Sequence, residues 1–238
     1  MQKRWPIALA LVSMTAIAQP KVSGESPRDM AFEFKMGALT PLIDRPFADL
    51  PQSQRPYQSV FGAPMLLAEV EIERQFFQRV GSLALGLSAG YAEKYGQALE
   101  ANTGAASSEG TSLHMLPLKL LAVYRFDWLA INQGIPLVPY LKGGGVLTHW
   151  WSQKGGATEV SDGQPALGWA WGFAGVGGLA VQLDFIDYRL ARDFDTGVGV
   201  NHTYLFAEFA FQEVKGKGSR RPLDFSSRHW MFGLAFEY

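Results

Sequence analysis

The sequence predicts an all-β protein, an eight-stranded antiparallel up-and-down transmembrane β-barrel in one domain over residues 30–238. Three observations support this fold. Residues 1–18 have the pattern of an export signal, and eight later segments alternate apolar with small or polar side chains. The composition is rich in glycine and aromatic residues but poor in charge. Alternation with a period of two is typical of β-strands.

The composition excludes several classes of protein. The 238 residues include 26 glycines and no cysteine, and the formal net charge is −1. A chain without cysteine has no disulfide scaffold, no thiol nucleophile and no Cys-ligated zinc. Near-neutral charge gives no electrostatic footprint for nucleic acid. Charged residues make up 18 %, below the ~25 % usual in soluble domains, which indicates much apolar surface. We expect no cofactor and no metal site.

Residues 1–18 have the pattern of a cleaved signal peptide. Lys3 and Arg4 precede an apolar stretch from Ile7 to Ile17, and Ala16 and Ala18 give the small-x-small pattern of a cleavage site. The stretch is shorter than the ~20 residues that a membrane-spanning helix needs. We therefore expect export, with residues 19–29 forming a periplasmic lead into the barrel.

The eight alternating segments account for most of the remaining chain. Long connections over 40–64, 92–112, 151–166 and 215–227 alternate with shorter ones over 76–81 and 126–136. This is typical of a membrane barrel with long outer loops and short periplasmic turns. The predicted strands are Ala31–Leu39, Leu66–Glu73, Ser82–Tyr91, Leu116–Arg125, Tyr140–Trp150, Gly168–Leu183, Thr203–Glu213 and Arg228–Tyr238.

The sixth segment has an alternative interpretation as a membrane helix. Residues 166–183 carry no charge, and Gly168 and Gly172 form a GxxxG pair. Trp169, Trp171 and Phe173 nevertheless recur at every second residue. Glycine disfavours a helix by about 1 kcal/mol per residue relative to alanine, so the pattern favours a strand.

The two faces of the strands differ in a way that predicts lipid outside and charge inside. One face carries Leu, Phe, Trp and Tyr, with aromatics such as Tyr140 and Trp150 near strand ends, where they suit interfacial girdles. A soluble lipocalin-like barrel is the alternative, but its surface would be strangely poor in charge. Small residues line the opposite face together with a predicted lumen charge network, which consists of Glu33, Lys35, Glu69, Glu71, Lys119, Lys142 and Glu208.

The C-terminus carries the most specific signal. Gly233 is followed by apolar residues at alternate positions, including Phe236, and by the terminal aromatic Tyr238. This ending resembles the signal by which outer-membrane barrels are recognised by their assembly machinery. The chain resembles the OmpA/OmpX/OmpW group, and its segments Pro117–Asp127, Pro136–Gly145 and Asn201–Glu208 most resemble a deltaproteobacterial (myxobacterial-type) barrel family. The resemblance implies an outer-membrane location, with membrane lipids and the barrel-assembly machinery as partners.

For function, the sequence predicts a non-enzymatic, monomeric barrel with a plugged lumen and a structural or loop-mediated binding role. One alternative is a narrow channel for small hydrophobic molecules. Another is a lipid-modifying enzyme with a His/Ser dyad at the outer rim. A basic loop is a candidate for contact with lipopolysaccharide phosphates. The dyad candidates are His114, His149 and His229 with Ser112, Ser152 and Ser227, and the basic loop contains Lys215, Lys217, Arg220 and Arg221.

The final strand gives a first testable prediction. Tyr238→Ala should lower the amount of protein inserted in cells, because the terminal aromatic serves recognition by the assembly machinery. The same variant refolded into detergent should keep near-normal thermal stability, because a lipid-facing ring contributes little to core packing. Normal insertion together with the ~3–5 kcal/mol loss typical of a buried aromatic would contradict the orientation of this strand.

Overall fold

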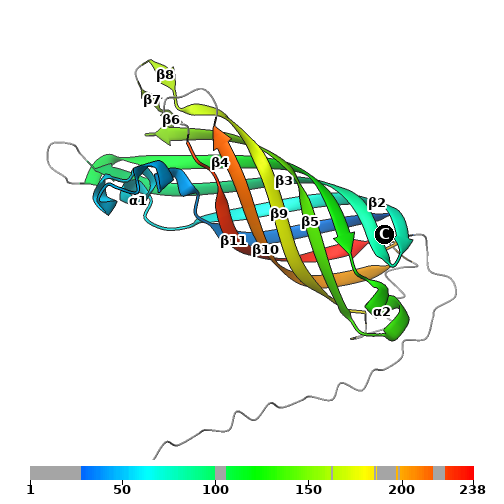
Figure 1. Cartoon of the computed structure of the whole chain (residues 1–238). Helices are drawn as coiled ribbons and strands as arrows, with labels where there is room; N and C mark the ends of the chain where they lie inside the picture. The colour runs from blue at the N-terminus through cyan, green and yellow to red at the C-terminus, as the bar shows by residue number, and fades with distance from the viewer. Residues whose placement is uncertain are drawn as a thin grey trace, which may run out of the picture.

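The structure, a computed structural model, is a closed antiparallel β-barrel. It describes residues 28–99, 106–161, 163–184, 186, 197, 199–216 and 223–238, so the predicted signal peptide and its Ala16 and Ala18 lie outside the described residues. Eight long strands form the wall (Figure 1). They are β1 (Met30–Leu39), β2 (Met65–Arg79), β3 (Gly81–Leu99), β4 (Ala106–Arg125), β5 (Leu137–Lys154), β9 (Leu167–Gln182), β10 (His202–Gly216) and β11 (Ser227–Glu237).

Each wall strand pairs with its neighbours in the sequence, and the first strand pairs with the last. Phe32 lies opposite Phe236 where β1 meets β11, and the Tyr238 amide donates to the Met30 carbonyl at 2.8 Å. Closure matters because lipid offers no partner to an unpaired backbone N–H or C=O group. The predicted up-and-down order of eight antiparallel strands is confirmed.

The segment predicted either as a strand or as a membrane helix is strand β9. It pairs with β5 on one side and with β10 on the other. No helix among the described residues is both long enough and apolar enough to cross a bilayer.

Two predicted connections are shorter than the sequence indicated, because the strands extend further. Strand β3 continues to Leu99 and β4 begins at Ala106, so the two strands occupy most of the predicted loop over 92–112. In this stretch, polar and small residues form the strands by backbone pairing alone. Alternation with apolar side chains is needed only where a strand faces the lipid. At the other end, β2 runs to Arg79 past a bulge beside Phe76, and Gly81 turns the chain with φ 87°.

Short helices lie at both ends of the barrel (Figure 1). The connection between β1 and β2, at the end that carries the long connections, contains η1 (Leu42–Phe47), η2 (Gln52–Gln54) and α1 (Pro56–Val60). The opposite end carries α2 (Trp128–Gln133), which ends at Gly134 with φ 66°. The small strands β6 (Ala157–Thr158), β7 (Val160–Ser161) and β8 (Gln164–Pro165) extend the connection after β5.

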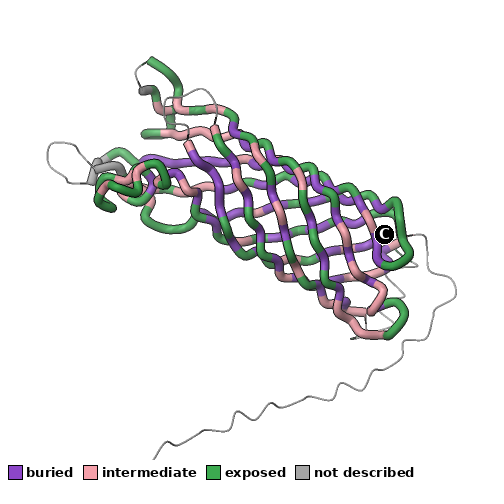
Figure 2. Tube along the Cα trace, viewed as in Figure 1, coloured by how far each residue is buried: buried purple, intermediate pink, exposed green. Residues whose placement is uncertain are grey.

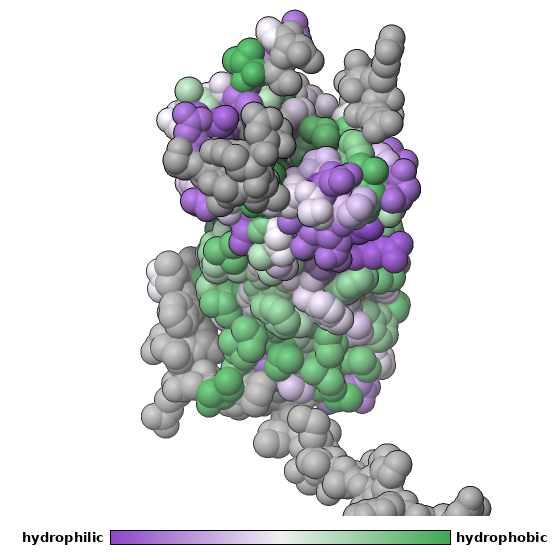
Figure 3. Space-filling model, turned by 90° about the vertical axis from the view of Figure 1, so that its left-hand side faces the viewer, coloured by the Kyte–Doolittle hydropathy of each residue, from purple (hydrophilic) through white to green (hydrophobic). Residues whose placement is uncertain are grey.

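The wall separates an apolar outside from a polar inside. Burial alternates residue by residue along the central part of the long strands (Figure 2). In the face shown in Figure 3, apolar residues gather in a broad lower zone and hydrophilic residues in an upper one. Exposed apolar side chains on the eight strands include Phe32, Phe34, Met36, Leu66, Val70, Ile72, Leu85, Leu87, Leu120, Leu141, Leu147, Trp171, Phe173, Leu179, Leu205, Phe209, Phe211, Trp230, Phe232 and Leu234.

Some glycines allow neighbouring strands to approach closely. Gly144 on β5 faces inward beside β4, where an added Cβ would collide with the Leu120 carbonyl oxygen. Its neighbour Gly145 faces outward, and an added Cβ there meets nothing within 4 Å. Substituting each of these two glycines by alanine therefore distinguishes the effect of close packing from the effect of backbone flexibility.

Gly144→Ala should lower the free energy of unfolding by about 1–3 kcal/mol, the range for overpacking, because the colliding atom belongs to the backbone and cannot rotate away. Gly145→Ala should be neutral or stabilise by up to about 1 kcal/mol, since alanine restricts the unfolded chain. Denaturant unfolding in detergent micelles measures both values. Equal effects at the two positions would contradict the close approach of β4 and β5.

Candidate functional site

The interior of the barrel holds a cluster of ion pairs that we call the ionic plug. All seven residues of the predicted lumen charge network are buried and face inward, on β1, β2, β4, β5 and β10. The register of β1 with β2 places Lys35 opposite Glu69 and Glu33 opposite Glu71. The first pair joins opposite charges, whereas the like-charged Glu33 and Glu71 each pair with both Lys35 and Lys142. The plug consists of Glu33, Lys35, Glu69, Glu71, Glu73, Lys119, Arg125, Lys142 and Glu208.

Lys142 stands at the centre of three carboxylates. Its Nζ lies 2.6 Å from Glu33, 3.0 Å from Glu71 and 2.9 Å from Glu73. These carboxylates offer oxygens within 4.8 Å of one another, a spacing that suits a metal ion. The ammonium already supplies the positive charge to all three, so the trio functions as a lysine cage.

A second ammonium and a guanidinium complete the plug. Lys35 Nζ lies 2.7 Å from Glu71 and 3.0 Å from Glu208. The Arg125 guanidinium pairs with Glu33 and, at 2.8 Å, with Glu73. Buried charges are tolerated only when they are paired in this way, because taking an ion out of water costs several kcal/mol.

Sequence reasoning left Glu73 and Arg125 out of the network. Glu73 lies two residues after Glu71, and Arg125 lies six residues after Lys119, so both face inward. This even spacing along the strand is the sequence signal that identifies them. The Glu237 carboxylate, also inward-facing, accepts hydrogen bonds from Gln75 at 2.6 Å and from the Tyr204 hydroxyl at 2.9 Å.

Two aromatic residues were wrongly assigned to the interfacial girdles. Tyr140 points into the lumen, where its hydroxyl donates to Glu208 at 2.9 Å. It shares the parity of Lys142, two residues along the same strand, so both must face the same side. Trp150 is half-buried and packs on Phe225, with ring centroids 5.4 Å apart.

An apolar cluster, which we call the outer cap, closes the end of the barrel that carries the long connections. Ile43 of η1, Tyr57 of α1 and Phe225 are buried against inward-facing residues that include Met65 and Met115. Asp44 ties the two helices together, because its carboxylate accepts from the Tyr57 and Gln58 amides at 2.7 and 2.9 Å. Burial, with Asp44 nearby, raises the pKa of the Tyr57 hydroxyl.

Arg45 fastens this connection to the rim. Its guanidinium lies 3.0 Å from Asp224 and 3.3 Å from Glu213. At the opposite end, the Asp184 carboxylate joins the ends of β9 and β10 through Gln182 and His202. Burial would raise the pKa of Asp184, but hydrogen bonds from His202, at 2.5 Å, and from Gln182 lower it.

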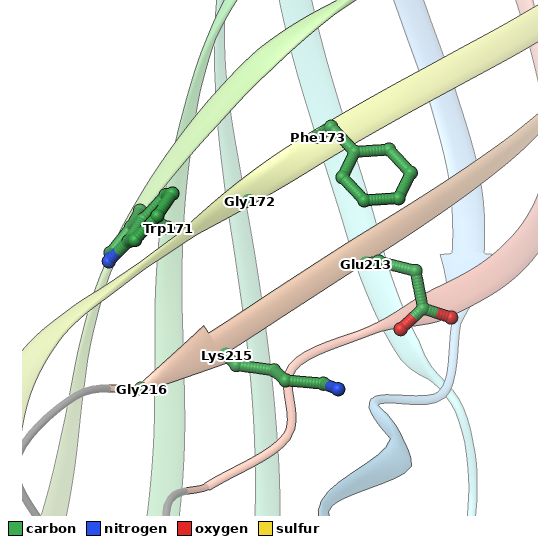
Figure 4. A pocket seen from close by; sticks show the side chains of 6 residues that line it. All are labelled: Trp171, Gly172, Phe173, Glu213, Lys215 and Gly216. Atoms are coloured by element: carbon green, nitrogen blue, oxygen red, sulfur yellow. The ribbon is translucent and has the colours of Figure 1, made fainter.

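A groove of about 460 Å³ lies on the outer face between β9 and β10, near the outer end (Figure 4). Trp171 and Phe173 flank Gly172, which leaves the floor bare, and Glu213 and Lys215 project from β10. Arg45 and the Ser226 hydroxyl hold the Glu213 carboxylate. Of the predicted basic loop, Lys217, Arg220 and Arg221 lie outside the described residues.

The predicted dyad residues fall into three different settings. Ser112 Oγ lies 2.9 Å from His114 Nε2 on the outer face, and Ser227 Oγ lies 3.1 Å from His229 Nδ1 in the lumen. His149 instead contacts the Gly168 carbonyl, and Ser152 donates to Glu159. The latter two therefore form no dyad.

The C-terminal residues lie as the alternation requires. Phe236 and Tyr238 are on the outward parity of β11 with Trp230 and Phe232. Gly233 faces inward, where an added Cβ would collide with the Phe34 carbonyl oxygen.

Comparison with known proteins extends only to the fold. No family model and no curated protein matches the chain. OprG from Pseudomonas aeruginosa is similar in structure, with a TM-score of 0.48 and 12% identity over 90% of this chain and 98% of that one. Neisserial surface protein A gives 0.44 and 11% over 91% and 100%, and the outer membrane enzyme PagL gives 0.39 and 11% over 86% and 97%. These solved neighbours are small outer-membrane barrels.

The lysine cage gives a prediction about stability. Lys142→Ala should lower the free energy of unfolding by about 3–5 kcal/mol, because it leaves three buried carboxylates without their shared counter-ion. Lys154→Ala is the control, since its pair with Glu109 is exposed and exposed pairs contribute about 0–1 kcal/mol. Guanidinium unfolding in detergent measures both. Adding Glu71→Gln to Lys142→Ala should recover part of the loss, and a neutral Lys142→Ala would contradict the cage.

Proposed function

We propose that this chain is an integral outer-membrane barrel that conducts no solute and acts through its outer surface and loops. The observation that carries the proposal is the inversion of the wall. Charged side chains are buried in the lumen, whereas apolar side chains cover the outside of all eight strands. Only a surrounding lipid makes such an outside favourable, because in water this area would drive association.

The sealed lumen supports a non-conducting role. Lys35, Glu69 and Glu71 are each 1% exposed or less and Lys142 is 4% exposed, so the described side chains leave the plug almost no contact with water. The outer cap lies above it and adds an apolar layer. Eight strands enclose an interior that side chains fill, unlike the channel of a larger barrel.

The outer end is the part of the molecule built for contact. Strands β3 and β4 extend beyond the inward-facing charges, and Arg45 holds η1 on the rim. The proposal includes contact with outer-membrane lipids, with lipopolysaccharide near Lys215, and insertion of a monomer by the barrel-assembly machinery. A narrow path for a small hydrophobic molecule is the competing function, and it requires the plug or the cap to open.

Liposomes that carry the purified chain should therefore not swell in arabinose, and planar bilayers should show no stable conductance. A large-pore barrel protein reconstituted in the same way is the positive control. The variant with Glu33, Glu71 and Lys142 all changed to alanine should leak small ions, because it removes the plug. Swelling or stable conductance with the unmodified chain would overturn the proposal.

A further inference from the structure

A chain of four polar side chains lies on the outer face of the barrel, above the lipid-facing residues of β3 and β4. Tyr91 and Glu93 come from β3, and Ser112 and His114 come from β4, with Glu93 opposite His114 in the register. All four have outward parity, because Ala92, Leu113 and Met115 between them are buried in the interior cluster. The wall thus presents these groups to the membrane side and not to the lumen.

The hydrogen bonds among these four side chains fix where each proton lies. The Tyr91 hydroxyl is 2.8 Å from Glu93 Oε2 and 2.8 Å from His114 Nδ1. It has one proton, and a carboxylate only accepts, so Tyr91 donates to Glu93. Nδ1 of His114 must then carry a proton and donate to the Tyr91 oxygen. In the neutral ring this leaves the lone pair on Nε2, which lies 2.9 Å from Ser112 Oγ.

We propose that Ser112 is the nucleophile and His114 the general base of a hydrolytic site for acyl esters, an activity beyond the sealed barrel proposed above. Ser112 Oγ bonds to the ester carbonyl carbon, and its proton passes to Nε2 of His114. The ester C–O bond breaks, and the leaving alcohol takes that proton. Water then attacks the acyl-serine by the same route, which releases the acid and restores Ser112. Tyr91 and Glu93 are positioning residues.

Aromatic rings hold the base in place. The His114 ring stacks on Trp151, with centroids 5.0 Å apart and an interplanar angle of 8°, and the Tyr95 ring meets it edge-on at 6.3 Å. A fixed ring keeps Nε2 directed at Ser112, which is the condition for efficient proton transfer between two side chains.

The other histidines lack this arrangement. His229 binds Ser227 through Nδ1, and its buried Nε2 has no hydrogen-bond partner in the part of the chain that the structure describes. That pair also faces the lumen, where no lipid reaches. Within the described residues, His202 hydrogen-bonds an acid, Asp184, but no serine. Ser112 and His114 are therefore the pair with both an outward position and an acid behind the base.

The surroundings indicate an ester with a long acyl chain. A groove of about 410 Å³ runs beside Tyr91, with Pro64, Leu66, Ala68 and Tyr95 among its lining residues. Its apolar floor continues the lipid-facing surface, so an acyl chain can rise from the membrane along it. Ser112 is 5% exposed and lies opposite Tyr95, whose side chain is 67% exposed. An exposed ring changes rotamer readily, and we infer that this movement of Tyr95 admits the ester while the stacked Trp151 ring keeps His114 in place.

The test uses the full chain refolded in detergent, with p-nitrophenyl decanoate in micelles as the substrate and a fluorophosphonate probe for the nucleophile. Ser112→Ala should reduce hydrolysis at least a thousandfold, to the rate of micelles without protein. Tyr91→Phe should lower kcat about a hundredfold with KM unchanged, because the ring stays but the fixed tautomer is lost. Ser227→Ala, the matched control from the lumen pair, should hydrolyse at the unmodified rate.

Mass spectrometry should place the fluorophosphonate adduct on Ser112, and p-nitrophenyl acetate should be a poorer substrate because it does not fill the groove. The faster migration of unboiled protein in gels verifies that each variant is folded. Hydrolysis that Ser112→Ala leaves unchanged would overturn the site. Absence of hydrolysis and of the adduct in the unmodified, folded chain would overturn it equally, and neither result bears on the liposome test of the sealed barrel.

Discussion

Closure of the β-ladder is the constraint on which the rest of this structure depends. Once β11 pairs with β1, the sheet has no open edge strand, and each side chain has only two directions available. Neighbours along a strand must take opposite ones. One parity therefore meets lipid and the other meets a narrow interior, and this choice governs packing, charge and the position of each candidate site.

The narrow interior explains why small residues and ion pairs occur together. Gly144 and Gly233 allow neighbouring strands to approach within contact distance, and the remaining space is filled by long charged side chains. Those charges are compatible with burial because Lys35, Arg125 and Lys142 each contact two or more carboxylates. The plug that fills the barrel is thus the same feature on which the proposed non-conducting role rests.

At the outer end of the barrel, side chains still alternate between outward and inward positions, but the outward ones no longer face the apolar interior of the membrane. Above the apolar belt, outward positions are no longer required to be apolar, so Tyr91, Glu93, Ser112 and His114 can occupy them. Inward positions remain apolar and pack under the cap, as Met115 does. These four polar side chains therefore lie beside the apolar belt, where the extended hairpin of β3 and β4 rises above it.

The sequence by itself determined the number of strands, their order and the direction of most side chains, because a period of two is a local property that each segment carries alone. Glu33, Lys35 and Lys142 could be placed inside on that basis. Only the tertiary structure decided which charges meet, that Tyr140 reaches Glu208, and that Ser112 and His114 join Tyr91. These contacts depend on the register between strands and on the stagger of the closed barrel. A repeat of two residues does not specify either one, since shifting a strand by two preserves every face while changing every partner.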